Sequence, residues 1–427
     1  MDYSEALKFI HGIARFGTKL GLSRVQLLLE RLGNPQKKLK FIHVAGTNGK
    51  GSTCTMISRV LSQAGYKTGL YISPFVLDFC ERIQIDGEMI DREDFARVAS
   101  KVKTYWDILD LEGDTPSEFE TLLACAFEYF LDNNVDIVLL EVGMGGRLDA
   151  TNVIDPPLAA AITSLGMDHM EYLGDTIEKI ATEKCGIIKP GSILVCYPEQ
   201  KPGAWEVIRR RCSEENVPLF IPEQAEVLSM GFFGSEMKYK GLKLALPLIG
   251  AHQIINATVA LELLLRLDGL GFKVNEQDIV RGMSKVSFPA RLEIISRRPL
   301  VILDGAHNVD GARVLGQALD MLGGRKIHAV VGMQAAKDVA GTLELILPHL
   351  ASLTAVSAQG VPGALPPGEL VGLIPSQSCT DLDTADSPRE GVEKATARLM
   401  GGEDVLLVCG SLYLASEVRP ILFEIFG

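Results

Sequence analysis

Short apolar runs alternate with amphipathic segments along most of the chain. Runs such as FIHVAG (41–46), VDIVLLEVG (135–143) and LAAAITS (158–164) have the length of strands and are largely apolar, which is typical of strands buried on both faces of a sheet. The segments 91–109 and 117–134 carry the period of amphipathic helices. This order predicts a mostly parallel sheet whose crossovers are right-handed.

The pattern changes near residue 225 and then starts again. Residues 225–248 predict an antiparallel β patch, and AHQIINATVALELLLRL (251–267) predicts a long helix. From about residue 297, apolar runs and helical segments alternate a second time, and the proline- and glycine-rich stretch 360–376 predicts a loop. We therefore predict an α/β protein with two domains, a larger one at 1–296 and a smaller, Rossmann-like one at 297–427.

Length, charge and cysteine spacing narrow the class of protein. A chain of 427 residues is too long for one ordinary core, which agrees with two domains. The net charge of -12 argues against nucleic acid or an anionic membrane surface as the main partner. The 8 cysteines include no C-x-x-C pair, so we interpret them as reduced core residues rather than zinc ligands. With no apolar run near the ~20 residues that span a bilayer and no signal-peptide pattern, we expect a soluble, cytoplasmic protein.

The stretch FIHVAGTNGKGST (41–53) ends an apolar run in a glycine-rich turn and continues as a predicted helix. Backbone N–H groups in such a turn converge on phosphate oxygens at the positive end of the helix, and Lys50 would reach the β- and γ-phosphates. The loop departs from G-x-x-x-x-G-K-[ST], because Val44 stands at the first glycine and Gly51 replaces the hydroxyl that normally holds magnesium. We therefore expect a P-loop ATPase-like domain whose magnesium ligands lie elsewhere. The residues of the predicted phosphate turn are Thr47, Asn48, Gly49, Lys50, Gly51 and Ser52.

Three more residues in the first domain are candidates for chemistry. Glu141 ends an apolar strand at the carboxyl edge of the sheet, where open α/β sheets bind ligands, and a carboxylate facing a phosphate loop is a natural magnesium ligand. A solvated acid at a strand end is the alternative. His169 and Lys184 lie in SLGMDHMEYLGDTIEKIATEKCGIIKPG. On its own, His169 is more often a structural histidine than a ligand, and Lys184 fits a surface charge.

The second domain also has polar residues where predicted strands end. In LDGAHN, Asp304 ends a strand and His307 lies at a helix entrance, where polar groups can face the first domain across a cleft. Arg291 in SFPARLE precedes the predicted boundary and could reach ATP phosphates, or it could be a surface cation. Ser411 in CGSLYLASEV could cap a helix or hold a carboxylate.

These segments together resemble the folylpolyglutamate synthase family, which is often bifunctional with dihydrofolate synthase and belongs to the Mur ligase superfamily. The resemblance rests on motifs in order along nearly the whole chain: LGLSRVQLLLERLGNPQ, HVAGTNGKGST, YISPFVLDFCERI, EVGMGGRLDATN, MDHMEYLGDTIEKIATEKCGIIKPG, GAHQIINA, PARLE, DGAHN and GSLYLASEV. It implies that the loop's missing magnesium ligands are Ser73, Glu141 and His169. It also implies that Lys184 is carbamylated, which would give an oxygen-bearing anion for a second magnesium ion.

The resemblance also implies the substrate contacts. ATP would meet Gly49 to Ser52, Asn256, Arg291 and Asp304, with Lys50, Lys184 and His307 as the catalytic residues. His307 and Ser411 would hold the incoming glutamate. The pterin-bearing substrate would lie near Ser117, Glu118, Phe119, Glu120, Leu148, Asp149 and Ala150. Phe119 also fits the core face of an amphipathic helix.

Two positions depart from the family's pattern. The common W-P-G-R is Phe288-Pro289-Ala290-Arg291 here, which keeps the arginine but loses the glycine at the hinge. Cys185 replaces the usual alanine beside Lys184, so the effect on carbamylation is open.

The reaction implied by the resemblance is ATP-dependent amide formation through an acyl phosphate, joining L-glutamate to reduced folates and to dihydropteroate, by a monomer that uses magnesium. A monofunctional folylpolyglutamate synthase is the nearest alternative. A cell-wall Mur ligase is a second, but the 42 residues before His43 leave no room for its usual UDP-binding domain. A P-loop switch that only hydrolyses ATP and a non-catalytic nucleotide-binding module are further alternatives; the latter leaves Glu141, His169 and Lys184 without a joint purpose.

Overall fold

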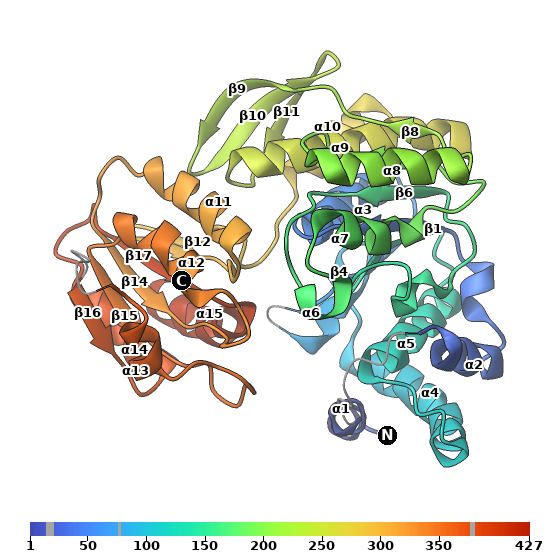
Figure 1. Cartoon of the computed structure of the whole chain (residues 1–427), viewed down its shortest axis with the longest axis horizontal. Helices are drawn as coiled ribbons and strands as arrows, with labels where there is room; N and C mark the ends of the chain where they lie inside the picture. The colour runs from blue at the N-terminus through green and yellow to red at the C-terminus, as the bar shows by residue number, and fades with distance from the viewer. Residues whose placement is uncertain (14–20, 76–77, 376–380) are drawn as a thin grey trace.

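The computed structural model describes residues 1–13, 21–75, 78–375 and 381–427. Three sheets organise these residues: an eight-stranded sheet in the N-terminal half, a six-stranded sheet in the C-terminal half, and a three-stranded sheet. Figure 1 shows the two larger units side by side, with the three-stranded sheet at the top of the view. The predicted α/β class, with a large, mostly parallel first sheet and a second α/β unit, is confirmed.

The eight-stranded sheet has the order β4-β3-β2-β5-β1-β6-β7-β8 and is parallel except at the β3–β4 edge. Strands β1, β2, β5, β6 and β7 are buried along their whole length, which explains why their sequences are apolar on both faces. The strands are β1 Phe41–Ala45, β2 Thr68–Tyr71, β3 Ile83–Ile85, β4 Glu88–Met89, β5 Ile137–Glu141, β6 Ala159–Ile162, β7 Leu194–Cys196 and β8 Leu219–Phe220.

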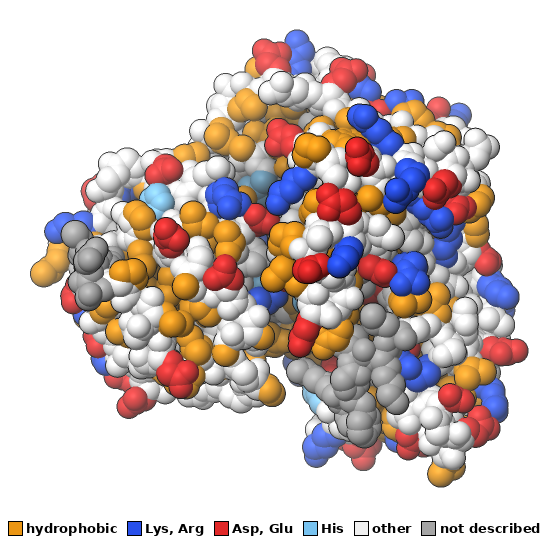
Figure 2. All heavy atoms as spheres, in the orientation of Figure 1, with side chains coloured by type: hydrophobic (Ala, Val, Ile, Leu, Met, Phe, Trp, Pro, Cys, Tyr) orange, Lys and Arg blue, Asp and Glu red, His pale blue; other side chains and the backbone are white. Residues whose placement is uncertain are grey.

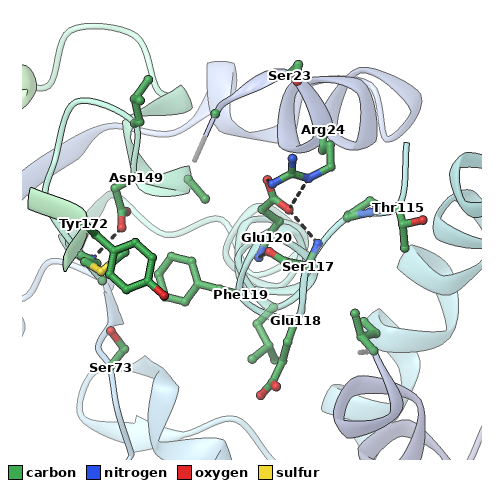
Figure 3. Close-up of a pocket in the computed structure, with 18 of the residues that line it drawn as sticks. Ser23, Arg24, Ser73, Thr115, Ser117, Glu118, Phe119, Glu120, Asp149 and Tyr172 are labelled. Carbon is green, nitrogen blue, oxygen red and sulfur yellow. Dashed lines mark hydrogen bonds and ion pairs between the residues drawn. The ribbon is translucent and has the colours of Figure 1, made fainter. Parts of the chain in front are cut away.

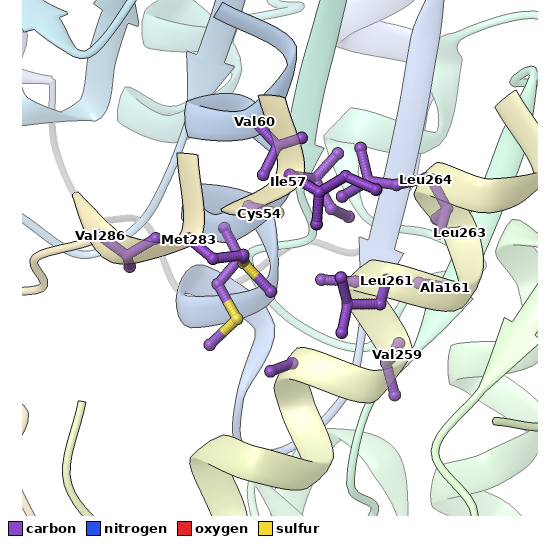
Figure 4. Packing of buried hydrophobic residues seen from close by; sticks show 14 of the residues in the cluster. Cys54, Ile57, Val60, Ala161, Val259, Leu261, Leu263, Leu264, Met283 and Val286 are labelled. Carbon is purple, nitrogen blue, oxygen red and sulfur yellow. The ribbon is translucent and has the colours of Figure 1, made fainter. Parts of the chain in front are cut away.

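Helices cover both faces of this sheet. Side chains of α3, α9 and α10 form one core with the sheet; Figure 4 shows residues of α3 such as Cys54 and Ile57 near Leu261 and Leu264 of α9. Helices α1, α2, α4 and α5 form a second core, and α7 and α8 a third. The helices are α1 Tyr3–Gly12, α2 Ser23–Arg31, α3 Lys50–Gln63, α4 Arg92–Glu112, α5 Glu118–Asp132, α6 Met170–Leu173, α7 Ile177–Lys184, α8 Pro202–Glu214, α9 Ala251–Leu267 and α10 Glu276–Ser284.

The antiparallel patch predicted at 225–248 is confirmed as the three-stranded sheet of β9 Glu226–Gly231, β10 Gly234–Tyr239 and β11 Leu242–Leu246. It precedes α9, whose range matches the predicted helix. Short 3-10 helices complete the chain at Pro35–Lys38, Phe79–Arg82, Ala150–Val153, Cys185–Ile187, Asp268–Leu270 and Leu347–His349.

The C-terminal sheet has the order β12-β13-β17-β14-β15-β16, in which only β12 is antiparallel to its neighbour. Its strands are β12 Glu293–Arg297, β13 Leu300–Leu303, β14 Ile327–Val331, β15 Ser352–Ala355, β16 Asp381–Thr384 and β17 Val405–Cys409. Its helices are α11 Val309–Asp320, α12 Val339–Ile346, α13 Pro367–Gly372, α14 Pro388–Ala397 and α15 Leu412–Phe426.

Two details differ from the sequence expectations or refine them. The stretch 360–376 is not a loop throughout, because Pro367 starts the short helix α13 and supplies the fixed φ that suits a first helical turn. The domain boundary at 296/297 stays a prediction, and it falls inside strand β12. The cysteines in the described ranges are free and buried. None of the helices in those ranges combines the length and apolar character needed to cross a bilayer.

Candidate active site

The glycine-rich loop joins β1 to α3 and presents the first turn of that helix. No side chain caps α3 within the described residues, so the amides of residues 49–52 lie at an uncapped positive helix end, as phosphate binding requires. Thr47 and Asn48 precede this helix, and their contact with phosphate stays a prediction. Both of their amides donate to the Ser164 carbonyl, over 2.8 and 3.3 Å, and so tie the loop to the segment after β6. The Lys50 ammonium donates to the Thr47 carbonyl at 3.3 Å.

Helix α9 lies against the same loop and explains one of its glycines. Gly49 has a φ of 88°, and a Cβ there would stand 2.6 Å from Oδ1 of Asn256. Only glycine therefore fits this position. Gln253 donates to the Ser52 hydroxyl at 3.4 Å. Asn256, predicted to contact ATP, is thus in contact range of the loop, although its role toward a nucleotide stays a prediction.

The ring of Phe288 occupies the space beside Gly51, the position where a hydroxyl residue is usual. A Cβ on Gly51 would lie 2.7 Å from Cζ of Phe288 and 3.5 Å from Oε2 of Glu141. Glu141 ends β5 and accepts the Ser73 N–H at 3.0 Å, and Lys50 Nζ lies 4.0 Å from its other oxygen. The structure therefore brings two of the predicted metal ligands, Glu141 and Ser73, together beside the loop.

Burial shifts the pKa values of the charged groups at this edge of the sheet. It raises the pKa of Glu141, while Lys50, the Ser73 N–H and Arg291 act in the opposite direction. Lys184 ends α7 and is 5% exposed, and its ammonium donates to the Gly46 carbonyl at 2.8 Å. Burial, reinforced by the charge of Lys50, lowers the pKa of Lys184 to about 7. Lys184 is therefore a buried amine with a lowered pKa, and not the surface charge that the sequence alone suggested.

His169 is the third of the predicted metal ligands. It precedes α6 with a left-handed φ of 48°, and its side chain is 44% exposed. Burial lowers its pKa, with Asp168 opposing. The described residues contain no group of three or more His, Cys, Asp and Glu side chains that could hold a metal ion. His169 nevertheless lines the same cavity as Ser73.

This cavity has a volume of about 960 Å³, and segments that follow β2, β5 and β6 contribute to its lining. Its walls come from α5 and the turn before it, from the segment after β5, and from the N-terminal helices (Figure 3). Every residue that the sequence placed near the pterin lines it: Ser117, Glu118, Phe119, Glu120, Leu148, Asp149 and Ala150.

Phe119 and Glu120 have different roles in the wall. Phe119 is partly buried, with its ring 5.8 Å from that of Tyr71, so it contacts the core and lines the cavity at once. Glu120 accepts two hydrogen bonds from Arg24, at 3.1 and 3.2 Å, and one from the Ser117 N–H at 2.7 Å, as the dashed lines in Figure 3 show. Its carboxylate therefore holds the wall together.

Asp149 is held by backbone amides. Its Oδ2 accepts the Met144 N–H at 2.8 Å and its Oδ1 accepts the Thr151 N–H at 3.0 Å. Burial raises its pKa, although these hydrogen bonds oppose the effect.

Arg24 and Arg82 also line the cavity, and neither was predicted as a site residue. Both lie in segments that carry the family resemblance, but a single arginine in such a segment cannot be told from a surface cation by sequence alone. Arg82 stacks over Phe75 and Phe79, at 5.2 and 5.7 Å from the ring centroids. The cavity therefore combines apolar walls with charged groups of both signs, in which Arg24 is paired with Glu120 and Arg82 lies over aromatic rings.

In the second domain, Asp304 directly follows β13 and is buried. Its oxygens accept the N–H groups of Leu292 and Ala306, each at 2.8 Å. Burial raises its pKa, and the charge of Arg291 opposes this shift. The guanidinium of Arg291 lies 5.8 Å from the centroid of Phe288. The charge of Arg291 also opposes the rise in the pKa of Glu141, so Arg291 acts on a carboxylate of each sheet.

His307 and Ser411 lie at helix entrances, as predicted. His307 Nδ1 is 2.9 Å from the Gly305 carbonyl, so Nδ1 carries the proton and Nε2 is the acceptor. Burial lowers the pKa of His307 to about 4. Ser411 caps α15 by accepting the Leu414 N–H at 3.1 Å, which confirms the cap interpretation. Glutamate binding by either residue stays a prediction.

Two contacts that the sequence did not predict join the domains beside the loop. Lys337 Nζ lies 3.1 Å from Oδ1 of Asp168. Asp310, at the start of α11, lies so close to Gly166 that a Cβ there would be 2.2 Å from its carboxylate. The Gly166 N–H in turn donates to the Thr47 hydroxyl at 3.0 Å. The second domain is therefore in contact with the segment that holds the phosphate loop.

Comparisons with known proteins agree with this architecture. The Mur ligase middle domain matches residues 44–264, and the Mur ligase, glutamate ligase domain matches residues 290–412. These matches place the chain among the Mur ligases.

Individual relatives specify the group more closely. A Bacillus subtilis dihydrofolate synthase/folylpolyglutamate synthase is 36% identical and aligns over 98% of this chain and 99% of its own. A Mycobacterium tuberculosis folylpolyglutamate synthase complexed with ADP and AMPPCP superposes with a TM-score of 0.89 at 29% identity, covering 99% of both chains. Escherichia coli FolC in complex with DHPP and ADP gives a TM-score of 0.86 at 29% identity over 100% of this chain and 98% of that one. The chain belongs to the dihydrofolate synthase/folylpolyglutamate synthase family.

Proposed function

We propose that this chain is an ATP-dependent ligase that adds L-glutamate to reduced folates and also to dihydropteroate. The observation that carries the proposal is the continuity of two sites: the cavity lined by the predicted pterin residues also touches Ser73 and His169, at the edge beside the glycine loop. A carboxylic acid bound in the cavity could therefore extend to the γ-phosphate of a nucleotide held by the loop.

The reaction has two steps. A carboxylate oxygen of the folate attacks the γ-phosphorus of ATP, the bond to ADP breaks, and an acyl phosphate forms. The amine of glutamate then attacks the acyl carbon, the bond to phosphate breaks, and the amine loses a proton. Lys50 and Arg291 stabilise the charge on the transferred phosphoryl group, work that is mainly positioning and electrostatics. The neutral His307, with its Nε2 as acceptor, suits a hydrogen bond from the incoming amine.

The oxygen atoms at the sheet edge suit a hard cation. Glu141 and Ser73 are adjacent, and the Glu141 carboxylate is buried with one amide and one lysine near it. Magnesium would be held by Glu141, Ser73 and His169, and when bound it would neutralise charge on the phosphate oxygens.

Carbamylation of Lys184 is part of the proposal. Its buried amine, with a pKa of about 7, has the neutral form that carbon dioxide requires. The nitrogen would bond to carbon and release one proton, giving an anion able to hold a second magnesium ion. In 13C-labelled bicarbonate, we expect a carbamate carbon signal that is absent from Lys184→Met; identical spectra would contradict the modification.

The proposal also covers the oligomeric state, the cellular location and the partners of the enzyme. We infer a monomer in the cytoplasm that acts on small molecules only, in keeping with the net charge of -12 and with the interspersed acidic and basic side chains on the face drawn in Figure 2. Light scattering after gel filtration tests the monomer, since a dimer would double the mass of 46.3 kDa.

Phosphate release tests the reaction. The purified protein with ATP, magnesium and glutamate should release phosphate when dihydropteroate or tetrahydrofolate is added, and little without either. Stimulation by tetrahydrofolate alone would indicate a monofunctional enzyme, and equal release in all tubes would favour a P-loop switch. Lys50→Ala should abolish turnover with an unchanged circular dichroism spectrum, because Lys50 is the only cation of the loop itself. An active variant would remove Lys50 from the mechanism.

A further inference from the structure

The turn at residues 290–292 carries Arg291 between two residues in an unusual conformation. Ala290 has a φ of 51° and Leu292 a φ of 49°, both in the left-handed region that favours glycine. Neither residue is glycine, so contacts elsewhere must hold the backbone in this shape.

The backbone hydrogen bonds of Ala290 and Leu292 go to residues of the C-terminal unit. The Ala290 N–H donates to Oε2 of Glu293 at 3.0 Å, and its carbonyl accepts the Gly305 N–H at 2.8 Å. The Leu292 N–H donates to Asp304 at 2.8 Å. Ala290 itself is fully buried. The backbone of the turn is therefore bonded to the C-terminal sheet and its loops, although the turn precedes the predicted boundary at 296/297.

Glu293 is in turn fixed by an arginine from the last helix. Arg419 in α15 donates from Nε at 2.9 and 3.0 Å to the two carboxylate oxygens, and from Nη2 at 2.6 Å. Its guanidinium also lies over Phe423, 4.6 Å from the ring centroid. An arginine fork of this kind sets both the position and the plane of a carboxylate, which a single lysine contact does not.

We propose that Arg419 and Glu293 are positioning residues for the ligase reaction: through the Ala290 N–H they hold the 290–292 turn so that Arg291 is presented to the ATP phosphates. This inference rests on the proposed function. A purely structural ion pair between Arg419 and Glu293 would only stabilise the second domain. It would not change the kinetic constants for ATP more than those for the folate.

The alternative predicts a different result in kinetics. If the pair only stabilises the fold, Arg419→Gln lowers the melting temperature and leaves the Michaelis constants unchanged. If it positions Arg291, Arg419→Gln should lower kcat/KM for ATP by about ten- to a hundredfold, because small displacements of a charged group have effects of this size. The KM for the folate should stay within twofold, since the folate cavity lies in the other domain.

A second substitution sharpens the test. Glycine adopts a positive φ without steric cost, so Ala290→Gly should make the turn less dependent on Glu293. We therefore expect Ala290→Gly to restore most of the ATP kcat/KM lost in Arg419→Gln. The matched control is Arg389→Gln, which breaks an exposed ion pair between α14 and α15, Arg389 to Glu424 at 2.6 Å, away from the turn.

The experiment measures initial rates of glutamate- and folate-dependent phosphate release, with melting temperatures for every variant. The proposal is overturned if Arg419→Gln matches Arg389→Gln in its ATP dependence, or if Ala290→Gly restores nothing. Should Arg419→Gln fail to fold, Glu293→Gln carries the test by the same criteria. A wild-type protein without folate-dependent turnover would instead sink the proposed function, so the two failures are distinguishable.

Discussion

Gly51→Ala tests the structural reason for the missing loop hydroxyl. The added Cβ would lie 2.7 Å from Cζ and 3.2 Å from Cε2 of Phe288, closer than carbon atoms approach each other. Phe288 must then move, and with it the guanidinium of Arg291 that lies over the ring. The substitution therefore perturbs the packing of the loop without changing its charge.

Two opposing free energies set the size of the effect. Overpacking of one methyl group costs about 1 to 3 kcal/mol. Alanine inside a helix is favoured over glycine by up to about 1 kcal/mol, and Gly51 lies in the first turn of α3. We expect overpacking to outweigh the helix preference, so that the free energy of unfolding falls by up to about 3 kcal/mol, with weaker AMPPCP binding as Arg291 is displaced.

Urea denaturation and calorimetric titration of AMPPCP measure both quantities. The sign should reverse in a Phe288→Ala background, where the ring is gone and only the helix preference remains. Gly12→Ala is the control, because an added Cβ there meets nothing within 4 Å. If Gly51→Ala destabilises the protein equally with and without the Phe288 ring, the contact between Gly51 and Phe288 does not explain the glycine.

Two other predictions concern ion pairs. Burial alone would raise the pKa of Glu262, but hydrogen bonds from Lys240 and Arg266 hold this pKa below its ordinary value. The carboxylate therefore stabilises the fold at a pH above its pKa in the unfolded chain, and this stabilisation is lost as the pH falls through its pKa in the folded protein. Glu262→Gln should therefore cost about 1 to 3 kcal/mol at pH 7 in urea denaturation, and the difference from wild type should shrink below about pH 4; a constant difference would contradict the argument. Lys337→Ala removes the 3.1 Å contact with Asp168 and should widen the distribution of domain separations in small-angle scattering of the ligand-free protein, whereas an unchanged profile would show that this pair does not restrain the domains.

The sequence predicted the fold where one physical rule dominates. Strands β1 and β5 are buried on both faces, so their apolar runs identify them without knowledge of the rest of the chain. Because parallel strands end at one edge, the positions of Glu141 and the glycine loop could also be predicted from the sequence.

Contacts between distant segments could not be predicted in this way. Phe288 and Gly51 are far apart in sequence, and nothing in either segment shows that a ring fills the space beside the loop. The amides of Thr47 and Asn48 illustrate the same limit, since their partner, Ser164, follows a different strand. A glycine-rich motif indicates that a loop can bind phosphate, but the tertiary contacts decide which amides are available.

The contact between Gly51 and Phe288 also connects the phosphate loop with residues of the second domain. Phe288 touches the phosphate loop, and the guanidinium of Arg291 lies over the same ring, while the backbone around Arg291 is bonded to Asp304 and Glu293 of the second domain. A serine at position 51 would have to displace that ring. The glycine thus leaves room for the Phe288 ring beside the loop. In the proposed reaction, Glu141 and Ser73 at the strand edge would take over the magnesium-binding role of the missing hydroxyl. Phe288 thus lies between Arg291 and the first turn of α3, where the phosphates would bind.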